Sequence, residues 1–285
     1  MDVAIDIGGT FTDAVAIDHY GVIKTAKTST THENLTVGAV NSLKALKINF
    51  DQVSSFVHGT TAGLNALLER KGGKVALITT KGFKDIYEIG RANRPEIYNF
   101  RYKRQKTLLS RSDIFEIDER IGPDGSIIKS IKKEEITNLL KESIINKYNS
   151  IAVCLLHSYK NPEHEEEIYS TINDEISDIP VIISSHVSPE WREYERTSTT
   201  VVSAYTSPIV IKYLTNLQKS LKKEGINVPI LIMQSNGGVV SAEFAKKNPV
   251  QTLLSGPVGG TKDGEPRGPG GASRKNQLFY RSKDP

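Results

Sequence analysis

The sequence predicts an α/β fold with a mixed β-sheet, and two observations support that prediction. First, the opening segment alternates apolar and polar side chains in three short runs, separated by Gly8-Gly9 and by His19-Tyr20-Gly21. This pattern is typical of an antiparallel meander. Second, apolar strand patterns alternate with helical patterns from residue 35 onward. Such β-α-β crossovers join parallel strands, so we expect parallel strands to join the opening meander.

The individual elements follow from the same patterns. Strands are predicted at residues 3–7, 11–17, 22–27, up to 57, 75–78, 114–119, 127–131, 151–156, 180–184 and 230–233. Helices are predicted at residues 35–46, 62–70, 133–148, from 161, 197–205 and, after a break at Pro208, up to about 224. Pro123-Asp124-Gly125 has the composition of a hairpin turn, so the strands on either side of it predict an inserted ribbon.

Composition excludes several classes of protein. The chain has 285 residues with a net charge of +4, and its basic residues are spread out, which does not indicate a nucleic-acid partner. A lone Cys154 cannot form an internal disulfide, which is typical of a reducing compartment. No apolar run reaches the roughly 18 residues of a membrane span, and no signal peptide opens the chain. We therefore expect a cytoplasmic protein without a membrane segment.

The most informative motif lies in the first hairpin. It combines two acids, two glycines and two threonines: Asp6, Gly8, Gly9, Thr10, Thr12 and Asp13. Glycines at a hairpin apex let backbone N–H groups approach a phosphate, and the threonines add hydroxyl donors. The acids would repel a bare phosphate, so they indicate Mg²⁺ with its waters between carboxylate and phosphate. The alternative is a tight turn without a ligand.

Two further segments carry candidate residues. His58-Gly59-Thr60-Thr61 ends a strand and begins a helix, where Thr60 and Thr61 could contact an anion and His58 could move a proton. The alternative is a helix N-cap beside a satisfied histidine. Arg91 and Arg94 could clamp a carboxylate or phosphate, although loop arginines are more often simply solvated.

Three later segments are also candidates. Glu193, Glu195 and Arg196 precede a helix, where the acids could contact a substrate or interact with the helix dipole. Gly237 and Gly238 follow a buried strand, where open α/β sheets place ligand loops. The segment from Ser255 could approach a nucleotide or form a plain turn. Cys154, inside an apolar strand, is expected to be an inert core thiol.

Taken in order, these motifs resemble the hydantoinase/oxoprolinase family, specifically the A-type subunit of N-methylhydantoinase-like enzymes. The resemblance covers roughly residues 2 to 260. Its segments are DIGGTFTD (6–13), HGTT (58–61), ALLERKG (66–72), LITTKGF (77–83), EIGRANRP (88–95), CLLHSYKNPEHE (154–165), EYERTSTTV (193–201), IMQSNGG (232–238) and LSGP (254–257).

The resemblance implies a ribonuclease-H-like lobe of the actin-like ATPase superfamily with a mixed sheet, plus the start of a second lobe. It implies ATP and Mg²⁺ as cofactors, hydrolysis of a hydantoin or 5-oxoproline ring, and a B-type partner subunit. Carried over, the first-hairpin residues would bind phosphate, with Asp6 and Asp13 at the metal, and Gly237 and Gly238 would contact the nucleotide. His58, Arg91 and Glu195 would take substrate-side catalytic roles.

The resemblance also predicts a domain organisation. Residues 1–185 would form the N-terminal domain, residues 186–260 the incomplete beginning of a hydantoinase A domain, and residues 261–285 a disordered tail unlike the family. Because the family's second phosphate loop is missing after Gly260, we expect a truncated subunit that is inactive alone. The alternatives are a non-catalytic fragment that docks a B-type subunit, a ketone-carboxylase subunit, and a small acyl or sugar kinase.

Overall fold

The computed structural model describes residues 1–31, 33–93, 98–102, 106–253 and 255, which form two compact units. Unit 1 combines residues 1–69 with the chain from residue 209 onward, and unit 2 consists of residues 70–208. Unit 2 is therefore an insertion into unit 1. The predicted domain boundary at residue 185 stays a prediction about family segments, because the compact units divide at other positions.

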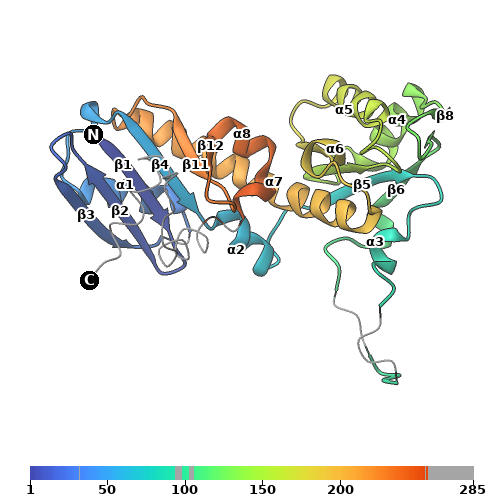
Figure 1. Cartoon of the computed structure of the whole chain (residues 1–285), viewed down its shortest axis with the longest axis horizontal. Helices are drawn as coiled ribbons and strands as arrows, with labels where there is room; N and C mark the ends of the chain where they lie inside the picture. The colour runs from blue at the N-terminus through green and yellow to red at the C-terminus, as the bar shows by residue number, and fades with distance from the viewer. Residues whose placement is uncertain (32, 94–97, 103–105, 254, 256–285) are drawn as a thin grey trace, which may run out of the picture. The chain divides into compact units, whose positions relative to one another are not determined.

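The sheet of unit 1 contains both antiparallel and parallel strands, as predicted. Its strand order is β3-β2-β1-β4-β11-β12, with β1–β3 antiparallel, β4 parallel to β1, β11 parallel to β4 and β12 antiparallel to β11 (Figure 1). The strands are β1 (Asp2–Ile7), β2 (Phe11–Ile17), β3 (Ile23–Ser29), β4 (Ser55–Thr60), β11 (Ile230–Met233) and β12 (Val239–Ser241). The order β3-β2-β1-β4-β11 is that of a ribonuclease-H-like lobe.

The period-two pattern of β1 explains how this sheet is buried. Val3, Ile5 and Ile7 point to one face and join an apolar core with helix α1 (Leu35–Ala45) and the second half of helix α7 (Glu193–Lys223). The intervening Ala4 packs on the opposite face with residues of β2, β4 and β11. Shorter helices α2 (Ala62–Leu68) and α8 (Ala242–Lys247) and the 3₁₀ turns Phe50–Gln52 and Pro249–Thr252 complete this unit.

Unit 2 is built on a separate, fully parallel sheet with the order β10-β9-β5-β6. The strands are β5 (Val75–Thr80), β6 (Ile114–Ile117), β9 (Ser150–Cys154) and β10 (Val181–Ile183). Both β5 and β9 are buried along their whole length, which explains their continuous apolar sequence. The core also includes residues of α4 (Lys133–Leu139), the π-helical turn Leu140–Ile144 and α5 (Glu163–Glu175). Short helices α3 (Ile86–Ile89) and α6 (Ser184–Val187) and the 3₁₀ turn Arg111–Asp113 complete the unit.

Two predictions about strand pairing are wrong. The strand at 75–78 does not join the opening meander, because β5 belongs to the sheet of unit 2. The predicted ribbon pairs differently as well: β6 lies parallel to β5, and the partner of β8 (Ile127–Lys129) is the short strand β7 (Arg120–Ile121). The apolar pattern of the sequence identified the strands, but their pairing depends on contacts between residues that are far apart in sequence.

The predicted helix break at Pro208 is also wrong, since α7 continues through this residue. A proline inside a helix removes one backbone N–H donor and crowds the preceding turn. At this point the carbonyl of Tyr205 accepts a hydrogen bond from the N–H of Gly73, at 2.9 Å. The carbonyl that loses its usual donor at Pro208 is that of Ala204, so this contact from outside the helix lies one residue further along the same turn.

Gly72 and Gly73 therefore do more than end a helix. A Cβ atom added to Gly72 would lie 2.0 Å from Cε1 of the buried Tyr205, and one added to Gly73 would lie 2.8 Å from Cγ of Pro208. The absence of both Cβ atoms lets this segment pack directly against α7.

We expect Gly72→Ala to lower the free energy of unfolding by about 1–3 kcal/mol, because the Tyr205 ring must move out of a packed position. Gly9→Ala is the matched control: an added Cβ there meets nothing within 4 Å, so its effect should stay within about 0.5 kcal/mol. Urea denaturation followed by circular dichroism measures both. Equal stability of the two variants would contradict the packing described for Gly72.

Within the described residues, no helix is both long enough and apolar enough to cross a membrane.

Candidate functional site

The carboxyl ends of β1, β4 and β11 meet at one edge of the sheet in unit 1. Because these three strands are parallel, the segments that follow them lie next to one another at this edge. The segments are the turn after Ile7, the entry to α2 at Thr61 and the turn after Met233. Each contains candidate residues from the sequence, so the fold gathers three predicted motifs in one place.

The first hairpin turn is tight and anchored by neighbouring groups. The N–H of Gly8 donates to the carbonyl of Phe11 at 2.9 Å. Thr30, at the end of β3, holds the turn twice: its hydroxyl donates to the carbonyl of Gly8 at 3.0 Å and its N–H donates to that of Thr10 at 2.9 Å. Gly9 and Thr10 are exposed at the apex. An exposed apex on a fixed base suits the approach of a ligand.

Thr12 lies beneath the turn, and its side chain is completely buried. Its hydroxyl lies 3.2 Å from that of Thr30, which itself donates to Gly8, so Thr12 acts as the donor of this pair. This position favours support of the turn over direct contact with phosphate. The contribution of Thr30 had no signal in the sequence, because β3 contains no motif that distinguishes it.

Asp6 and Asp13 are directly opposite each other on β1 and β2. Antiparallel partners point to the same face, with Cβ atoms about 4.5–5.5 Å apart, so both carboxylates lie on one side of the hairpin. Asp13 forms an ion pair with Lys27 at 3.4 Å, and both side chains are partly exposed. An exposed pair of this kind contributes about 0–1 kcal/mol, so a stronger cation could replace the lysine.

This donor set fits Mg²⁺. The ion is commonly held by one or two carboxylates, with waters and substrate phosphates completing its coordination. The described residues contain no cluster of three or more His, Cys, Asp or Glu side chains that could hold a metal. A site at Asp6 and Asp13 would therefore depend on water and phosphate oxygens for its remaining ligands.

His58 lies inside the core of unit 1 with its side chain fully buried. Its Nδ1 is 3.2 Å from the carbonyl oxygen of Ile5, which can only accept, so Nδ1 carries the proton. Its Nε2 therefore accepts from the hydroxyl of Tyr213, at 2.7 Å. Burial lowers the pKa of His58 to about 4, which keeps the ring neutral near neutral pH. These contacts favour the satisfied histidine over a proton carrier, and its catalytic role stays a prediction.

The residues after His58 support the same edge of the sheet. The hydroxyl of Thr61 donates to the carbonyl of Ile7 at 3.0 Å, and the hydroxyl of Thr60 accepts from the N–H of Ala62 at 3.2 Å. The hydroxyl of Ser255 donates to the carbonyl of Thr60 at 3.2 Å. These bonds attach the start of α2 to the base of the glycine turn. The bond to Ile7 uses the hydroxyl hydrogen of Thr61, which could otherwise contact an anion.

Gly237 and Gly238 form the turn between β11 and β12. Gly237 adopts φ +82°, a conformation that glycine tolerates well. Its N–H donates to the carbonyl of Gln234 at 3.0 Å, and the N–H of Gly238 donates to the side chain of Asn236 at 2.8 Å. Both amides are thus used within the turn, and their nucleotide contact stays a prediction.

Two predicted catalytic residues meet in unit 2. The Nε of Arg91 donates to Oε1 of Glu195, in the first turn of α7, at 2.7 Å. This bond to Arg91 is the main cause that holds the pKa of Glu195 below its usual value. The structure therefore brings together an exposed arginine and a carboxylate that are 104 positions apart in sequence. Arg94 and the segment 256–260 lie outside the described residues, as does the predicted tail.

Sequence reasoning missed a buried polar network at the carboxyl edge of the second sheet. Arg196 is 1% exposed, and its guanidinium donates to Oγ of Ser158 at 2.5 Å and to the carbonyl of Leu155 at 2.8 Å. The buried carboxylate of Glu165 accepts from Ser184, at 2.6 Å, and from the N–H of Leu155, at 2.9 Å. The network thus joins the first turn of α7 to the ends of two strands.

A second buried acid lies at the same edge. Glu119 hydrogen-bonds to Nδ1 of His164 at 2.6 Å and to the hydroxyl of Thr80. Cys154 is buried as expected, and burial raises the pKa of its thiol. The sequence did not distinguish Glu119, His164 and Glu165 from solvated residues, because nothing local indicates their burial.

Family models match most of the chain. Residues 2–176 match the hydantoinase/oxoprolinase N-terminal region, and residues 196–263 match hydantoinase/oxoprolinase. The chain belongs to the hydantoinase/oxoprolinase family. The resemblance seen in the motifs is thereby confirmed. A relative in this family, an uncharacterised protein of Methanocaldococcus jannaschii, is 42% identical over 262 residues, covering 90% of this chain and 38% of that protein.

Solved structures of the family confirm the α/β fold class. The ATP-dependent caprolactamase of Pseudomonas jessenii aligns with a TM-score of 0.81 at 29% identity, covering 93% of this chain and 40% of that one. Nucleotide-free acetone carboxylase aligns with a TM-score of 0.79 at 28% identity, covering 91% of this chain and 39% of that one. The chain spans about two fifths of the length of these relatives.

Proposed function

We propose that this member of the hydantoinase/oxoprolinase family provides the phosphate- and Mg²⁺-binding part of an ATP-dependent enzyme that opens cyclic amides. The observation that supports this proposal most is the first hairpin. Asp6 and Asp13 lie opposite each other beside the exposed apex formed by Gly9 and Thr10, at the edge of the sheet where α/β proteins bind ligands. Solved relatives described as ATP-dependent share this fold.

ATP would supply a phosphoryl group to the amide oxygen, with ADP as the leaving group. Resonance makes an amide carbon a poor electrophile, and a phosphorylated oxygen removes that stabilisation. Water would then add to the carbon, and the ring C–N bond would break to leave an amine and an acyl phosphate. A second water would hydrolyse the acyl phosphate to a carboxylate and free phosphate. In this scheme the Asp6 and Asp13 carboxylates hold Mg²⁺, while the amides and hydroxyl of Gly9 and Thr10 face the phosphates. Arg91 and Glu195 would orient the ring substrate in unit 2.

The proposal includes a partner and a location. Relatives in the family are named as subunits, among them a caprolactamase subunit alpha and an acetone carboxylase beta subunit. We therefore expect a partner subunit, of the B type, to contribute to ring hydrolysis. A cytoplasmic location and a hydantoin or 5-oxoproline substrate are the finer parts of the proposal.

Phosphate release from ATP, measured on this chain combined with a B-type subunit, tests the proposal. We expect 5-oxoproline, hydantoin or caprolactam to stimulate release. Asp13→Asn should reduce the stimulated rate by about 100-fold or more, because the substitution removes charge from the proposed metal site. Asp174→Asn, at an exposed position of α5, is the matched control and should retain the rate. Equal rates for both variants would reject the assignment of Asp13.

Ketone activation is a second candidate, because one solved relative is an acetone carboxylase. The same assay distinguishes the two functions when acetone and bicarbonate replace the cyclic amide. Stimulation by acetone and not by any of the three amides would replace the ring-opening function with a carboxylase function. In either case, the phosphate-binding role of the first hairpin would be unchanged.

A further inference from the structure

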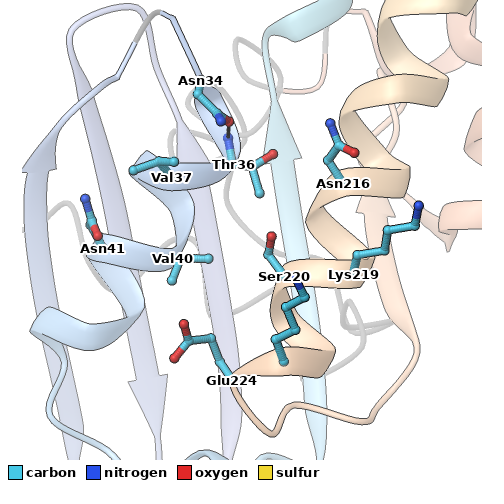
Figure 2. A pocket seen from close by; sticks show the side chains of 10 residues that line it. Asn34, Thr36, Val37, Val40, Asn41, Asn216, Lys219, Ser220 and Glu224 are labelled. Carbon is cyan, nitrogen blue, oxygen red and sulfur yellow. Dashed lines mark hydrogen bonds between the residues drawn. The ribbon is translucent and has the colours of Figure 1, made fainter.

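A groove between α1 and the second half of α7 lies within unit 1 and belongs to none of the candidate sites. Its volume is about 370 Å³. One wall carries Asn34, Val37 and Asn41 of α1, and the facing wall carries Asn216, Lys219 and Ser220 of α7 (Figure 2). The groove is therefore lined by two helices that pack on the same sheet, and it opens to the surface.

The charges along the groove favour an anionic occupant. Lys219 and Lys223 are exposed lining residues, and neither forms an ion pair with another residue of the described chain. They are four residues apart on one helix, a spacing at which like charges repel by a few tenths of a kcal/mol. The acid lining the groove, Glu224, is paired with Lys44 at 2.7 Å. The negative charge of Glu224 is therefore paired with a lysine of α1, on the opposite wall.

The remaining lining residues favour a peptide over a small anion. Val37 is 44% exposed on the wall formed by α1, and the half-buried Val40 lies one turn further along. Such side chains suit aliphatic contacts, while the asparagine amides can both donate to and accept from a peptide. A small anion would stay largely hydrated in an open groove, whereas pockets for small ligands bury most of the ligand surface.

We propose that this groove binds an acidic amphipathic segment of the partner subunit. Carboxylates of that segment would meet Lys219 and Lys223, and its aliphatic side chains would lie against Val37 and Val40. The inference rests on the proposed function at one point, because it takes the partner to be the second subunit of the enzyme. It extends that function by assigning the partner a surface away from the first hairpin.

Selection from a displayed library of random 16-residue peptides tests the proposal on the purified chain. We expect the enriched peptides to contain an excess of Asp and Glu interspersed with aliphatic residues. Synthetic copies of the enriched peptides, labelled with fluorescein, should bind in an anisotropy titration. Binding should weaken about tenfold in the Lys219→Glu/Lys223→Glu variant, since two attractive charge pairs become repulsive.

The Lys212→Glu/Lys222→Glu variant is the matched control. It makes the same change in net charge at exposed lysines of α7 outside the groove, so it should bind the peptides within about twofold of the original chain. Enrichment of peptides poor in acids, or equal weakening by both double variants, would overturn the proposal. Peptide binding without Mg²⁺-dependent ATP binding would reject the proposed function but support the groove as a peptide site. Mg²⁺-dependent ATP binding without peptide binding would reject only the proposal about the groove.

Discussion

Replacing Arg196 with methionine is expected to destabilise unit 2 by about 3–5 kcal/mol. Methionine approximates the volume of the arginine stem but removes the charge and both hydrogen bonds, to Ser158 and to Leu155. The buried carboxylate of Glu165, which the hydroxyls of Ser158 and Ser184 link to Arg196, would then lose the positive charge of its network. Breaking a buried charge network from one side has a cost of this size. Because unit 2 carries these contacts, its amides should lose protection from hydrogen exchange.

Arg192→Met is the matched control, since Arg192 is exposed four residues earlier and its guanidinium lies over the ring of Trp191. Its effect should stay within about 0.5 kcal/mol. Hydrogen exchange followed by mass spectrometry reports on peptides of each unit separately. Similar protection of β9 and β10 in the two variants would contradict the structural role assigned to Arg196.

The stability of unit 1 is expected to fall by up to about 3 kcal/mol through His58 alone as the pH drops from 7 to 4. The pKa of His58 is about 4 in the folded chain, against 6.5 for an ordinary histidine side chain. Between these values the unfolded chain binds a proton that the folded chain does not, so folding becomes less favourable as pH decreases. Each pKa unit of difference corresponds to about 1.4 kcal/mol. Above pH 6.5 the His58 ring is mostly neutral in both the folded and the unfolded chain, so this loss of stability is absent.

A comparison with His58→Gln isolates this contribution from the titration of other groups. The variant will be less stable at pH 7, because Tyr213 and Ile5 lose a matched partner. Its deficit relative to the original chain should shrink by about 2 kcal/mol between pH 6.5 and pH 5. His19→Gln, on an exposed turn, controls for the loss of an imidazole elsewhere. A deficit that stays constant over this range would contradict a neutral, buried His58.

Local patterns in the sequence predicted most elements but not their assembly. The alternation in residues 3–7 and 11–17 indicated two strands, and their register confirms the antiparallel pairing. The strand at 75–78 has the same apolar character as the others, so nothing in it indicated a second sheet. Beside Pro208, the carbonyl of Tyr205 in α7 accepts a hydrogen bond from Gly73, which is 132 positions away in sequence. Such contacts have no local signature.

The candidate site was predictable to the extent that one short segment contains it. Asp6, Gly9 and Asp13 are separated by a few residues, so their positions on one hairpin followed from the turn itself. The support from Thr30 and the burial of His58 under Tyr213 arise from packing between separate elements. For this reason, the sequence indicated residues whose side chains can bind ligands or react, but it could not separate those at the surface from those in the core.

Isothermal titration of the chain with ATP, in the presence and absence of Mg²⁺, tests the central claim most directly. The account predicts saturable binding that requires Mg²⁺, is competed by tripolyphosphate, and is lost in Asp6→Asn/Asp13→Asn with an unchanged circular dichroism spectrum. Competition by tripolyphosphate is expected because the described hairpin would bind phosphates rather than adenosine. Binding that is independent of Mg²⁺ or retained in the double variant would contradict the account, as would an absence of binding at millimolar ATP.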